Sequence, residues 1–581
     1  MPPRKEIVLA GAGPVGLVVA IELARRGVKA ILVDPKPEIA WSSRAICVSR
    51  RSQEILRRIG VTQAFFDKAL PWSRGKTFHR DKLVFQLEMP YSGADRFAPF
   101  VNIQQFYTER FLLDTLEGLR SNAVEIRWGH AIENVEQHDT GGVAVIRGPE
   151  GRYDLEFDWL VAADGARSPV RTAIGHTLHG TSYEGRYLIA DIKVDAASWP
   201  VERHVWFDPV SNPGSTVIVH VQPDEVWRID IQIDPSLDDA AALHDGFLQP
   251  LIARHLSDVM GVNAPFDVIW RSVYRAHALS MDSYRDRRVL FAGDAAHLVP
   301  IFGVRGLNSG IDDAHNLAWK LAMVVNGEAE PPLLDSFTEE RRAATLENLG
   351  NAIKSTWFMS PPNGGFRTLR DAALRLAETE DWARELINPR QSSAHVYKAS
   401  SIIEYDGDCD LAEAGSVLRS VRLPDGRFLH DLLASDRLTL VSIGYDAEGA
   451  ACDLAGSLGL HFVSVPAESY NANGITDCRL LLVRPDEHIA SRFTSLDAQS
   501  LRAAVDRALG RKPGKVASFV PVDHVDRVVP YTPAEALFSR LATEKGFKDG
   551  DIDSAIKLLV RGMAAIKRDS VHTAHGYATP Q

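Results

Sequence analysis

The chain has 581 residues, of which 45% are hydrophobic and 24% are charged. This length exceeds what one hydrophobic core supports, so we expect two to four domains. The formal net charge of −11 leaves no basic excess that could neutralise phosphates, which argues against nucleic acid as the main partner.

The cysteines and the apolar runs bear on the cellular compartment. The four cysteines form no CxxC pair and have no histidine at zinc-site spacing, so we expect free thiols in a reducing cytosol and no metal site. The chain opens directly into an apolar strand without a signal-type run, and no apolar stretch of 18 residues follows. These features predict a soluble, cytoplasmic protein with no membrane partner.

The first part of the chain carries the signature of a nucleotide-binding βαβ unit. A strand, a glycine-rich turn, a helix and a second strand are expected over residues 6–10, 11–16, 17–26 and 30–33. In the turn Gly11-Ala12-Gly13-Pro14-Val15-Gly16, the three glycines permit a tight turn, close approach of a pyrophosphate and close helix packing. Asp34 lies 18 residues after Gly16, where its carboxylate can accept a hydrogen bond from a ribose hydroxyl. An unphosphorylated ribose is expected, which leaves both FAD and NAD open.

Two further apolar strands end in an acid and a glycine ahead of a helix. Strand 160–163 runs into the segment DGARSPVR at 164–171, whose Ser168 and Pro169 suit the N-cap and the first helical position. Strand 289–291 runs into Gly293-Asp294, and a turn rich in proline and glycine leads to a helix beginning near Asn308. The N–H groups at such a helix start suit an anionic, ring-shaped ligand.

Two polar residues between these segments have two interpretations each. Arg44 is either a solvated surface charge or a group that reaches a diphosphate. Gln105 either pairs with Glu109 one helical turn further along the same helix, or contacts the nucleotide.

The segments GAGPVG, DGARSPVR and GDAAHLVPIFGVRGLNSGIDDAHNLAWK agree in order and spacing with the motifs of the class A FAD-dependent aromatic hydroxylases. The chain resembles this family, typified by para-hydroxybenzoate, phenol and hydroxyphenylpropionate hydroxylases, over residues 5–350. The resemblance implies an α/β fold in which a Rossmann-like FAD-binding domain is interleaved with an antiparallel β-sheet substrate domain. It also implies FAD as cofactor, NADH or NADPH and O2 as co-substrates, and a small aromatic substrate.

The resemblance assigns FAD contacts residue by residue. Gly11, Gly13 and Gly16 are expected to hold the pyrophosphate, Asp34 the adenosine ribose and Asp294 the ribityl chain. The backbone of Leu307 and Asn308 is expected to face the flavin pyrimidine edge, where the helix dipole stabilises the anionic reduced ring. The other expected FAD residues are Pro14, Val15, Arg44, Gln105, Asp164, Gly165, Gly293 and Gly306. In the family, Asp164 and Gly165 are also implicated in use of the nicotinamide cofactor.

The turn before the helix departs from the family pattern. Ile301 stands where a second proline is frequent after Pro300, and the turn reads Gly303-Val304-Arg305-Gly306 where small or amide residues are usual. Arg305 either favours an anionic substrate or forms a structural salt bridge. His297, within the motif, is expected to be hydrogen-bonded inside the turn rather than catalytic.

Residues 176–281 change character and read as the substrate domain. The runs 215–221 and 226–233 alternate as strands of a half-buried antiparallel sheet do, and in the family this sheet is the floor of the substrate pocket. The candidates for contact with the substrate are His204, Trp206, His220, Tyr187 and Gln232 from the sheet, and Pro300, Phe302 and Arg305 from the turn. Packing is the alternative role for each, and no catalytic base is predicted among them.

The remaining chain is divided by its composition and strand order. We expect a discontinuous FAD-binding domain at 1–175 and 282–355, the substrate domain at 176–281, a helical connector at 356–400, an α/β domain at 401–515 and a helical extension at 516–581. The order of strands and helices in 401–515 resembles the thioredoxin-like C-terminal domain of many longer members of the family. The connector should contain one helix over 369–386. The thioredoxin-like domain lacks CxxC, so a structural role or a homodimer contact is expected rather than redox activity. A calcium loop at Asp549, Asp551 and Asp553 is rejected, because Ser554 and Val560 replace the glycine and glutamate that such a loop requires.

The predicted function is hydroxylation of a phenolic or related aromatic substrate through a flavin C4a-hydroperoxide. A Baeyer–Villiger or ring-opening monooxygenase remains an alternative because the same peroxyflavin serves both chemistries. An interaction protein that FAD only stabilises is the non-enzymatic alternative. A flavin-dependent halogenase is disfavoured, since the WxWxIP signature is absent.

Overall fold

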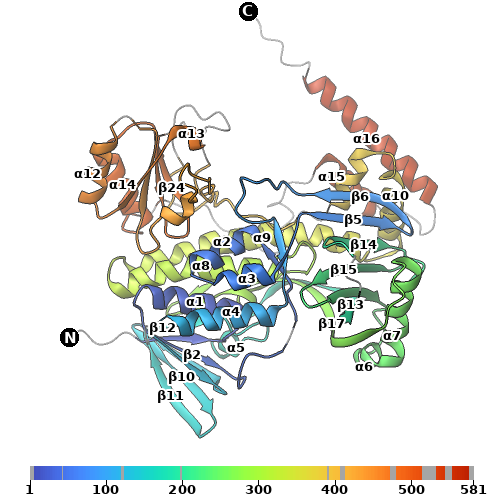
Figure 1. The fold of residues 1–581 in the computed structure, drawn as a ribbon, viewed down its shortest axis with the longest axis horizontal. Helices are drawn as coiled ribbons and strands as arrows, with labels where there is room; N and C mark the ends of the chain where they lie inside the picture. Colours follow the sequence, from blue (N-terminus) through green and yellow to red (C-terminus); the bar gives the residue numbers. More distant parts are fainter. Residues whose placement is uncertain are drawn as a thin grey trace, which may run out of the picture.

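The computed structural model describes residues 6–41, 43–119, 123–195, 199–388, 391–405, 413–445, 447–470, 479–512, 514, 532–543 and 552–574. They form a mixed α/β architecture with a nucleotide-type sheet, a large second sheet and a small C-terminal α/β unit (Figure 1). The predicted fold class is confirmed. Of the rejected calcium loop, Asp549 and Asp551 lie outside the described residues, as do Cys409 and Cys478. No helix in the described part of the chain is long and apolar enough to cross a lipid bilayer.

The first sheet has six strands, with the expected βαβ unit at its centre. The strands follow the order β18 (Arg285–Asp286), β19 (Val289–Phe291), β12 (Trp159–Ala162), β1 (Ile7–Ala10), β2 (Ala30–Asp34) and β8 (Val124–Trp128). β19, β12, β1, β2 and β8 run parallel to one another. Helix α1 (Pro14–Arg25) packs between α4 (Gln105–Gly118) and the long buried helix α8 (Gly306–Asn326) (Figure 1). The carboxyl ends of β1, β2, β12 and β19 therefore meet along one edge of the sheet.

The second sheet has eight strands and forms the wall of the central cavity. Their order is β20 (His297–Leu298), β17 (Phe266–Ser280), β13 (His179–Val194), β16 (Val226–Ile233), β15 (Thr216–Gln222), β14 (Arg203–Phe207), β5 (Arg74–His79) and β6 (Lys82–Glu88). All neighbouring pairs are antiparallel except β14 and β5. One face packs on α7 (Asp245–Arg254). The outer strands β5 and β6 come from residues 74–88, so the sheet gathers segments from both sides of the range 176–281.

Two small sheets and five further α-helices complete the described part of the chain up to residue 359. After β8 the chain forms an antiparallel sheet of β11 (Gly151–Phe157), β10 (Gly141–Gly148) and β9 (Ala131–His138). A second three-stranded sheet joins β3 (Cys47–Ser49), β7 (Phe100–Asn102) and β4 (Leu70–Trp72). The helices are α2 (Arg50–Arg58), α3 (Gln63–Lys68), α5 (Pro169–Ala173), α6 (Asp239–Leu243) and α9 (Asp335–Met359).

The expected helix over 369–386 is wrong, because the structure has two helices there. These are α10 (Gly364–Leu376) and α11 (Asp381–Ile387). Glu380 is the N-cap of α11 and Asp381 lies in its first turn, where negative charge is favourable, whereas the same acids inside a continuous helix would approach its negative end. Arg384 then donates to the carbonyl of Ala377 at 2.9 Å and closes the end of α10.

The C-terminal unit has the strand order expected for a thioredoxin-like fold. Its sheet runs β22 (His461–Val465), β21 (Thr439–Ile443), β23 (Leu480–Val483) and β24 (Ile489–Phe493), with only the first pair parallel. Helices α12 (Glu448–Ser457) and α14 (Ala498–Ala508) cover one face. The last two helices, α15 (Pro533–Thr543) and α16 (Ile552–Ala574), leave this unit and pack on α10 beside β5 and β6 (Figure 1).

A buried cluster of charges joins the C-terminal unit to the nucleotide-binding part. Glu487 lies between the side chains of Arg51, Arg58 and His315, and the Nη1 of Arg51 donates to it at 2.8 Å. His315 also contacts Glu22 at 2.5 Å. Burial alone would lower the pKa of His315, but the carboxylates of Glu487 and Glu22 outweigh it and raise the pKa to about 9.

This raised pKa predicts a specific loss of stability in alkaline solution. Protonated His315 stabilises the fold fully below its unfolded pKa of about 6.5 and loses this contribution as the pH rises through its folded pKa. We expect the melting temperature to fall by several degrees between pH 6.5 and pH 9, and His315→Gln to be less stable at pH 6.5 with a flatter profile. Scanning calorimetry of both proteins measures this, with the exposed His138→Gln as control. An unchanged slope in His315→Gln would contradict the assignment.

Candidate functional site

A cavity of about 820 Å³ runs from the carboxyl edge of the first sheet to the inner face of the second. The strand ends at Gly11, Asp34, Asp164 and Gly293 line it on one side, and β13 to β17 line it on the other. One continuous space therefore connects a nucleotide-type cradle with an antiparallel floor.

The first glycine-rich turn is shaped by backbone contacts that exclude side chains. Gly11 has φ +97°, and a Cβ at this position would lie 2.5 Å from the carbonyl oxygen of Ala163. A Cβ on Gly16 would lie 1.9 Å from the carbonyl oxygen of Gly11. Gly13, in contrast, has open space beside it and lines the cavity. Gly11 and Gly16 thus bring strand and helix together, while Gly13 leaves room for a ligand.

The acid at the end of β2 organises the same turn. Asp34 accepts hydrogen bonds from the backbone N–H groups of Ala12 at 2.7 Å and Lys36 at 2.9 Å. Its carboxylate also lines the cavity, so the lone pairs that remain can accept from a ligand hydroxyl.

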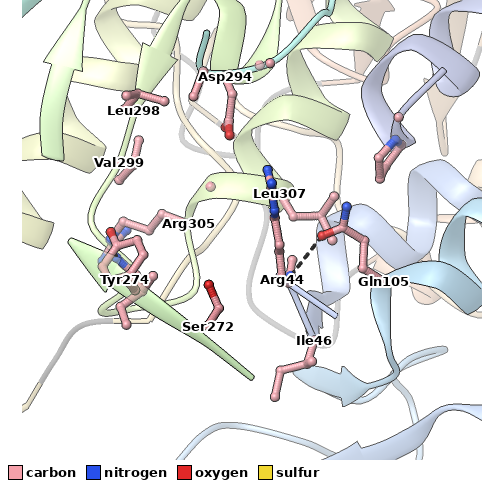
Figure 2. Close-up of a pocket in the computed structure, with 18 of the residues that line it drawn as sticks. Arg44, Ile46, Gln105, Ser272, Tyr274, Asp294, Leu298, Val299, Arg305 and Leu307 are labelled. Carbon is pink, nitrogen blue, oxygen red and sulfur yellow. Dashed lines mark hydrogen bonds between the residues drawn. The ribbon is translucent and has the colours of Figure 1, made fainter. Parts of the chain in front are cut away.

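Arg44 and Gln105 lie on the same side of the cavity as Leu307 (Figure 2). Gln105 accepts from the backbone N–H of Ala45 at 2.9 Å and donates to Glu109 at 2.9 Å. The intrahelical pair with Glu109 is therefore present, and it positions the amide at the cavity wall rather than removing it from the site.

The segment DGARSPVR at residues 164–171, which follows β12, is hydrogen-bonded to the loop after β19. Ser168 caps α5 by accepting from the backbone N–H of Arg171 at 2.9 Å. Arg171 donates to the carbonyl of Ala295 at 2.8 Å. Asp164 accepts from Val170 at 3.1 Å, while its other oxygen is buried without a partner among the described residues, and burial raises its pKa.

The third motif presents Asp294 to the cavity. Its side chain lies deep in the protein yet is accessible from the cavity, and burial raises its pKa. Asp313 on α8 fixes this loop by accepting from the backbone N–H of Gly293 at 3.0 Å and contacting the Nε2 of His297 at 2.6 Å. His297 thus has a structural role, through α8 rather than within the turn.

Helix α8 begins at Gly306, at the wall of the cavity. Gly306 and Leu307 line it, and the first N–H groups of a helix have no acceptor within the helix. Asn308 does not line the cavity, because its side-chain oxygen accepts from the backbone N–H of Ser49 at 2.8 Å and its amide donates to the carbonyl of Cys47 at 3.1 Å. Asn308 therefore holds the helix start against β3.

The structure brings most of the expected cofactor residues to one cavity. Those that line it are Gly11, Gly13, Pro14, Val15, Asp34, Arg44, Gln105, Asp164, Gly165, Gly293, Asp294, Gly306 and Leu307. Gly16 and Asn308 lie behind this surface and support it. Which part of a dinucleotide each residue contacts stays a prediction.

Some of the residues expected to contact the substrate line the cavity, and others do not. His220, Phe302 and Arg305 line the cavity, and Pro300 does not. Tyr187 lies behind the wall, where its hydroxyl bonds Ser360 at 3.0 Å and its ring meets Phe302 edge-on.

Three expected sheet residues do not reach the substrate cavity. His204 and Trp206 stack with Phe78 on the opposite face of the sheet, because neighbouring residues of a strand point to opposite faces. Gln232 has the right face but lies beyond the end of the cavity.

Arg305 lines the cavity and also makes a structural contact, here with a neutral amide where a salt bridge was the expected alternative. Its guanidinium donates to the side-chain oxygen of Asn348 at 2.9 Å and is buried. Tyr274, drawn next to Arg305 in Figure 2, accepts from the backbone N–H of Ile301 at 3.1 Å and so holds the turn.

The charged residues of the cavity floor are not among the residues predicted from the sequence. Arg203, Arg228 and Asp230 all line the cavity and are buried. A signal was present, since Arg228 and Asp230 alternate with Trp227, Ile229 and Ile231 in a strand that is otherwise apolar. Charged residues at every second position of a buried strand indicate a polar cavity on that face.

Comparison with known proteins agrees with this architecture. Residues 4–352 match the model of an FAD binding domain family, and residues 412–512 match the C-terminal domain of aromatic-ring hydroxylases. The chain belongs to the class A FAD-dependent aromatic hydroxylases. The cradle fits FAD, since its glycines leave space at Gly13 and its acids face the cavity at Asp34 and Asp294.

Two curated relatives illustrate the similarity. The chain is 29% identical over 374 residues to a 3-(3-hydroxy-phenyl)propionate/3-hydroxycinnamic acid hydroxylase of Mycolicibacterium smegmatis, covering 64% of this chain and 65% of that enzyme. It is 30% identical over 408 residues to a 12-dehydrotetracycline 5-monooxygenase/anhydrotetracycline 6-monooxygenase of Streptomyces rimosus, covering 66% and 76%. The chain thus aligns with a little under two thirds of the first of these enzymes.

Solved structures resemble the chain over a longer span. The flavin-dependent monooxygenase PieE, solved with FAD and substrate, gives a TM-score of 0.74 at 22% identity, over 87% of this chain and 99% of that one. The OxyS anhydrotetracycline hydroxylase from Streptomyces rimosus gives 0.67 at 26% identity, over 87% and 99%. The first of these likenesses concerns the fold alone.

The position of Asp294 predicts a loss of FAD affinity on its removal. Asp294→Ala deletes a cavity-facing carboxylate, and a hydrogen bond to a charged group contributes roughly 1.5–3 kcal/mol, so FAD should bind about 10–100-fold more weakly. Desalting followed by the absorbance ratio of flavin to protein measures retention, and quenching of added FAD gives the dissociation constant. The exposed Asp282→Ala is the control, and full retention of colour by Asp294→Ala would count against the ribityl assignment.

Proposed function

We propose that the chain is a monooxygenase that hydroxylates a phenolic substrate with FAD, O2 and NADH or NADPH. The observation that carries this proposal is the continuity of the cavity, which joins the FAD cradle to a floor suited to an aromatic ring. The names of the curated relatives support the same substrate class.

Residues at the two ends of the cavity have different functions, one end binding FAD and the other the substrate. FAD, when bound, would supply electron transfer from the nicotinamide and the activation of O2. The N–H groups at the start of α8, near Gly306 and Leu307, stabilise negative charge that develops beside them. Apolar side chains of the floor, among them Val205, Ile218 and Trp270, line the cavity and limit water around the ring.

The proposal predicts that phenolic acids stimulate oxidation of the nicotinamide. The purified, FAD-loaded protein should oxidise NADH or NADPH slowly alone and at least several-fold faster with a suitable phenol, giving a product heavier by one oxygen atom. The first panel should include 3-(3-hydroxyphenyl)propionate and larger polycyclic phenols, followed by oxygen uptake and mass spectrometry with labelled O2.

The products also separate the alternatives. An unchanged rate and no oxygenated product across the panel would contradict the hydroxylase proposal. An ester or a ring-opened product in place of a new ring hydroxyl would favour the Baeyer–Villiger or ring-opening chemistry.

A further inference from the structure

The cavity floor carries a row of polar side chains across three neighbouring strands. His204 on β14 pairs with Val219 on β15, so Arg203 lies beside His220, which in turn pairs with Arg228 on β16. Asp230 lies two residues further along β16 on the same face. All four side chains line the cavity.

The charges in this row are not all paired. Arg228 pairs with Asp191, donating through Nε at 2.8 Å, and both are buried. Arg203 is also buried, yet no described residue gives its side chain a hydrogen bond or a carboxylate partner, and its Nε is without an acceptor. Burial lowers the pKa of Arg203 to about 10, which still leaves it charged at neutral pH. A buried cation without a partner is costly, so the site is complete only when an anion is present.

Asp230 is the other incomplete group of the floor. No described residue makes a hydrogen bond to its carboxyl group, and one oxygen is buried without a partner. Burial raises its pKa to about 7, although Arg228 opposes the shift and Asp191 adds to it. The carboxyl group can therefore gain or lose a proton near neutral pH.

The other titratable groups around Asp230 keep a fixed charge in that range. Burial and the nearby arginines hold the pKa of His220 well below its usual value, and burial raises the pKa of Cys47 to about 12. The remaining neighbours are Arg228, held by Asp191, Arg203, and Tyr187 on β13, whose pKa burial raises further above its usual value so that it stays uncharged.

We propose that Arg203 and Asp230 recognise the two ends of a phenol that carries an anionic group, with Arg203 binding the anion and Asp230 taking the proton of the ring hydroxyl. This inference rests on the proposed function of the cavity. From the strand spacing and register, the Cα atoms of the two residues lie about 12 Å apart, which leaves room for one aromatic ring between their side chains. In the proton transfer, the O–H bond of the phenol breaks, a new O–H bond forms on the carboxylate of Asp230, and the electron pair stays on the phenolate oxygen. The phenolate is the more electron-rich ring.

The role of Arg203 is tested by equilibrium binding to the FAD-loaded protein. The probes are 3-(3-hydroxyphenyl)propionate and its neutral amide, followed by the change in flavin absorbance and by calorimetry. The wild type should bind the acid at least tenfold more tightly than the amide, Arg203→Met should lose this preference, and Arg203→Lys should retain part of it. FAD affinity should stay unchanged in both variants.

The matched control is His204→Gln, the next residue of β14 on the opposite face, which should keep the preference for the acid. If the wild type binds the acid no more tightly than the amide, or if Arg203→Met keeps the preference, the assignment of Arg203 is wrong. Binding is measured without turnover, so this result is separate from the test of monooxygenase activity.

The role of Asp230 is tested by the pH profile of turnover. The wild-type kcat should rise with pH around 7 as Asp230 ionises, and Asp230→Asn should lower kcat about 10²–10³-fold and remove this inflection. A ring-fluorinated phenol acid whose hydroxyl is already ionised at the assay pH needs no proton acceptor. With this substrate the difference in kcat between Asp230→Asn and the wild type should therefore be smaller. Binding of the acid should change little, and Gln232→Met, on the same strand face outside the cavity, is the control. A gap of equal size for ionised and neutral phenols would show that Asp230 is not the proton acceptor.

Discussion

The carboxylate of Asp313 is the point on which the geometry of the site depends. It accepts from the backbone N–H of Gly293, contacts His297, and accepts from Arg341 on α9 at 2.7 Å. Asp313, His297 and Arg341 are almost completely buried. Loss of the carboxylate would leave the Nε of buried Arg341 and the backbone N–H of Gly293 without their acceptor, a cost of several kcal/mol. The charged side chain of Asp313 on α8, which does not itself line the cavity, therefore holds the loop that carries Asp294 in place.

The same network extends away from the cavity into the C-terminal unit. Arg341 also donates to Asp312 at 2.6 Å, and Arg51 connects Asp312 to Glu487. A parallel group joins Glu340 of α9 to Arg484 at 2.5 Å. Helix α8 thus has the cavity at its first turn and buried ion pairs along its length. Through Glu487 and Arg484, the C-terminal unit stabilises the helices that hold the cavity loop. This structural role needs no redox-active cysteine pair.

The sequence predicted those parts of the site that are local in the chain. The turn from Gly11 to Gly16 and the acids Asp34 and Asp294 follow from motifs of a few residues after an apolar strand. The faces of the sheet were not predictable in the same way, because a shift of one residue exchanges the faces. His204 was expected in the cavity, whereas its neighbour Arg203 lies there. At the break between α10 and α11, the side chain of Arg384 donates a hydrogen bond to the carbonyl of Ala377. The spacing of hydrophobic residues in the sequence gives no sign of such a polar contact.

The charges of the floor show why composition is a poor guide to a binding site. The chain has a net charge of −11, which by itself would disfavour an anionic ligand. Within the floor, however, Asp191 neutralises Arg228 and His220 stays uncharged, so the local field is set by Arg203 and by the protonation of Asp230. Interactions of this kind are strong because the surrounding side chains exclude water and the effective dielectric constant is low. An acidic protein can therefore present an unpaired cation such as Arg203 to a cavity, and the position of that cation follows from strand register and burial rather than from the sum of the protein's charges.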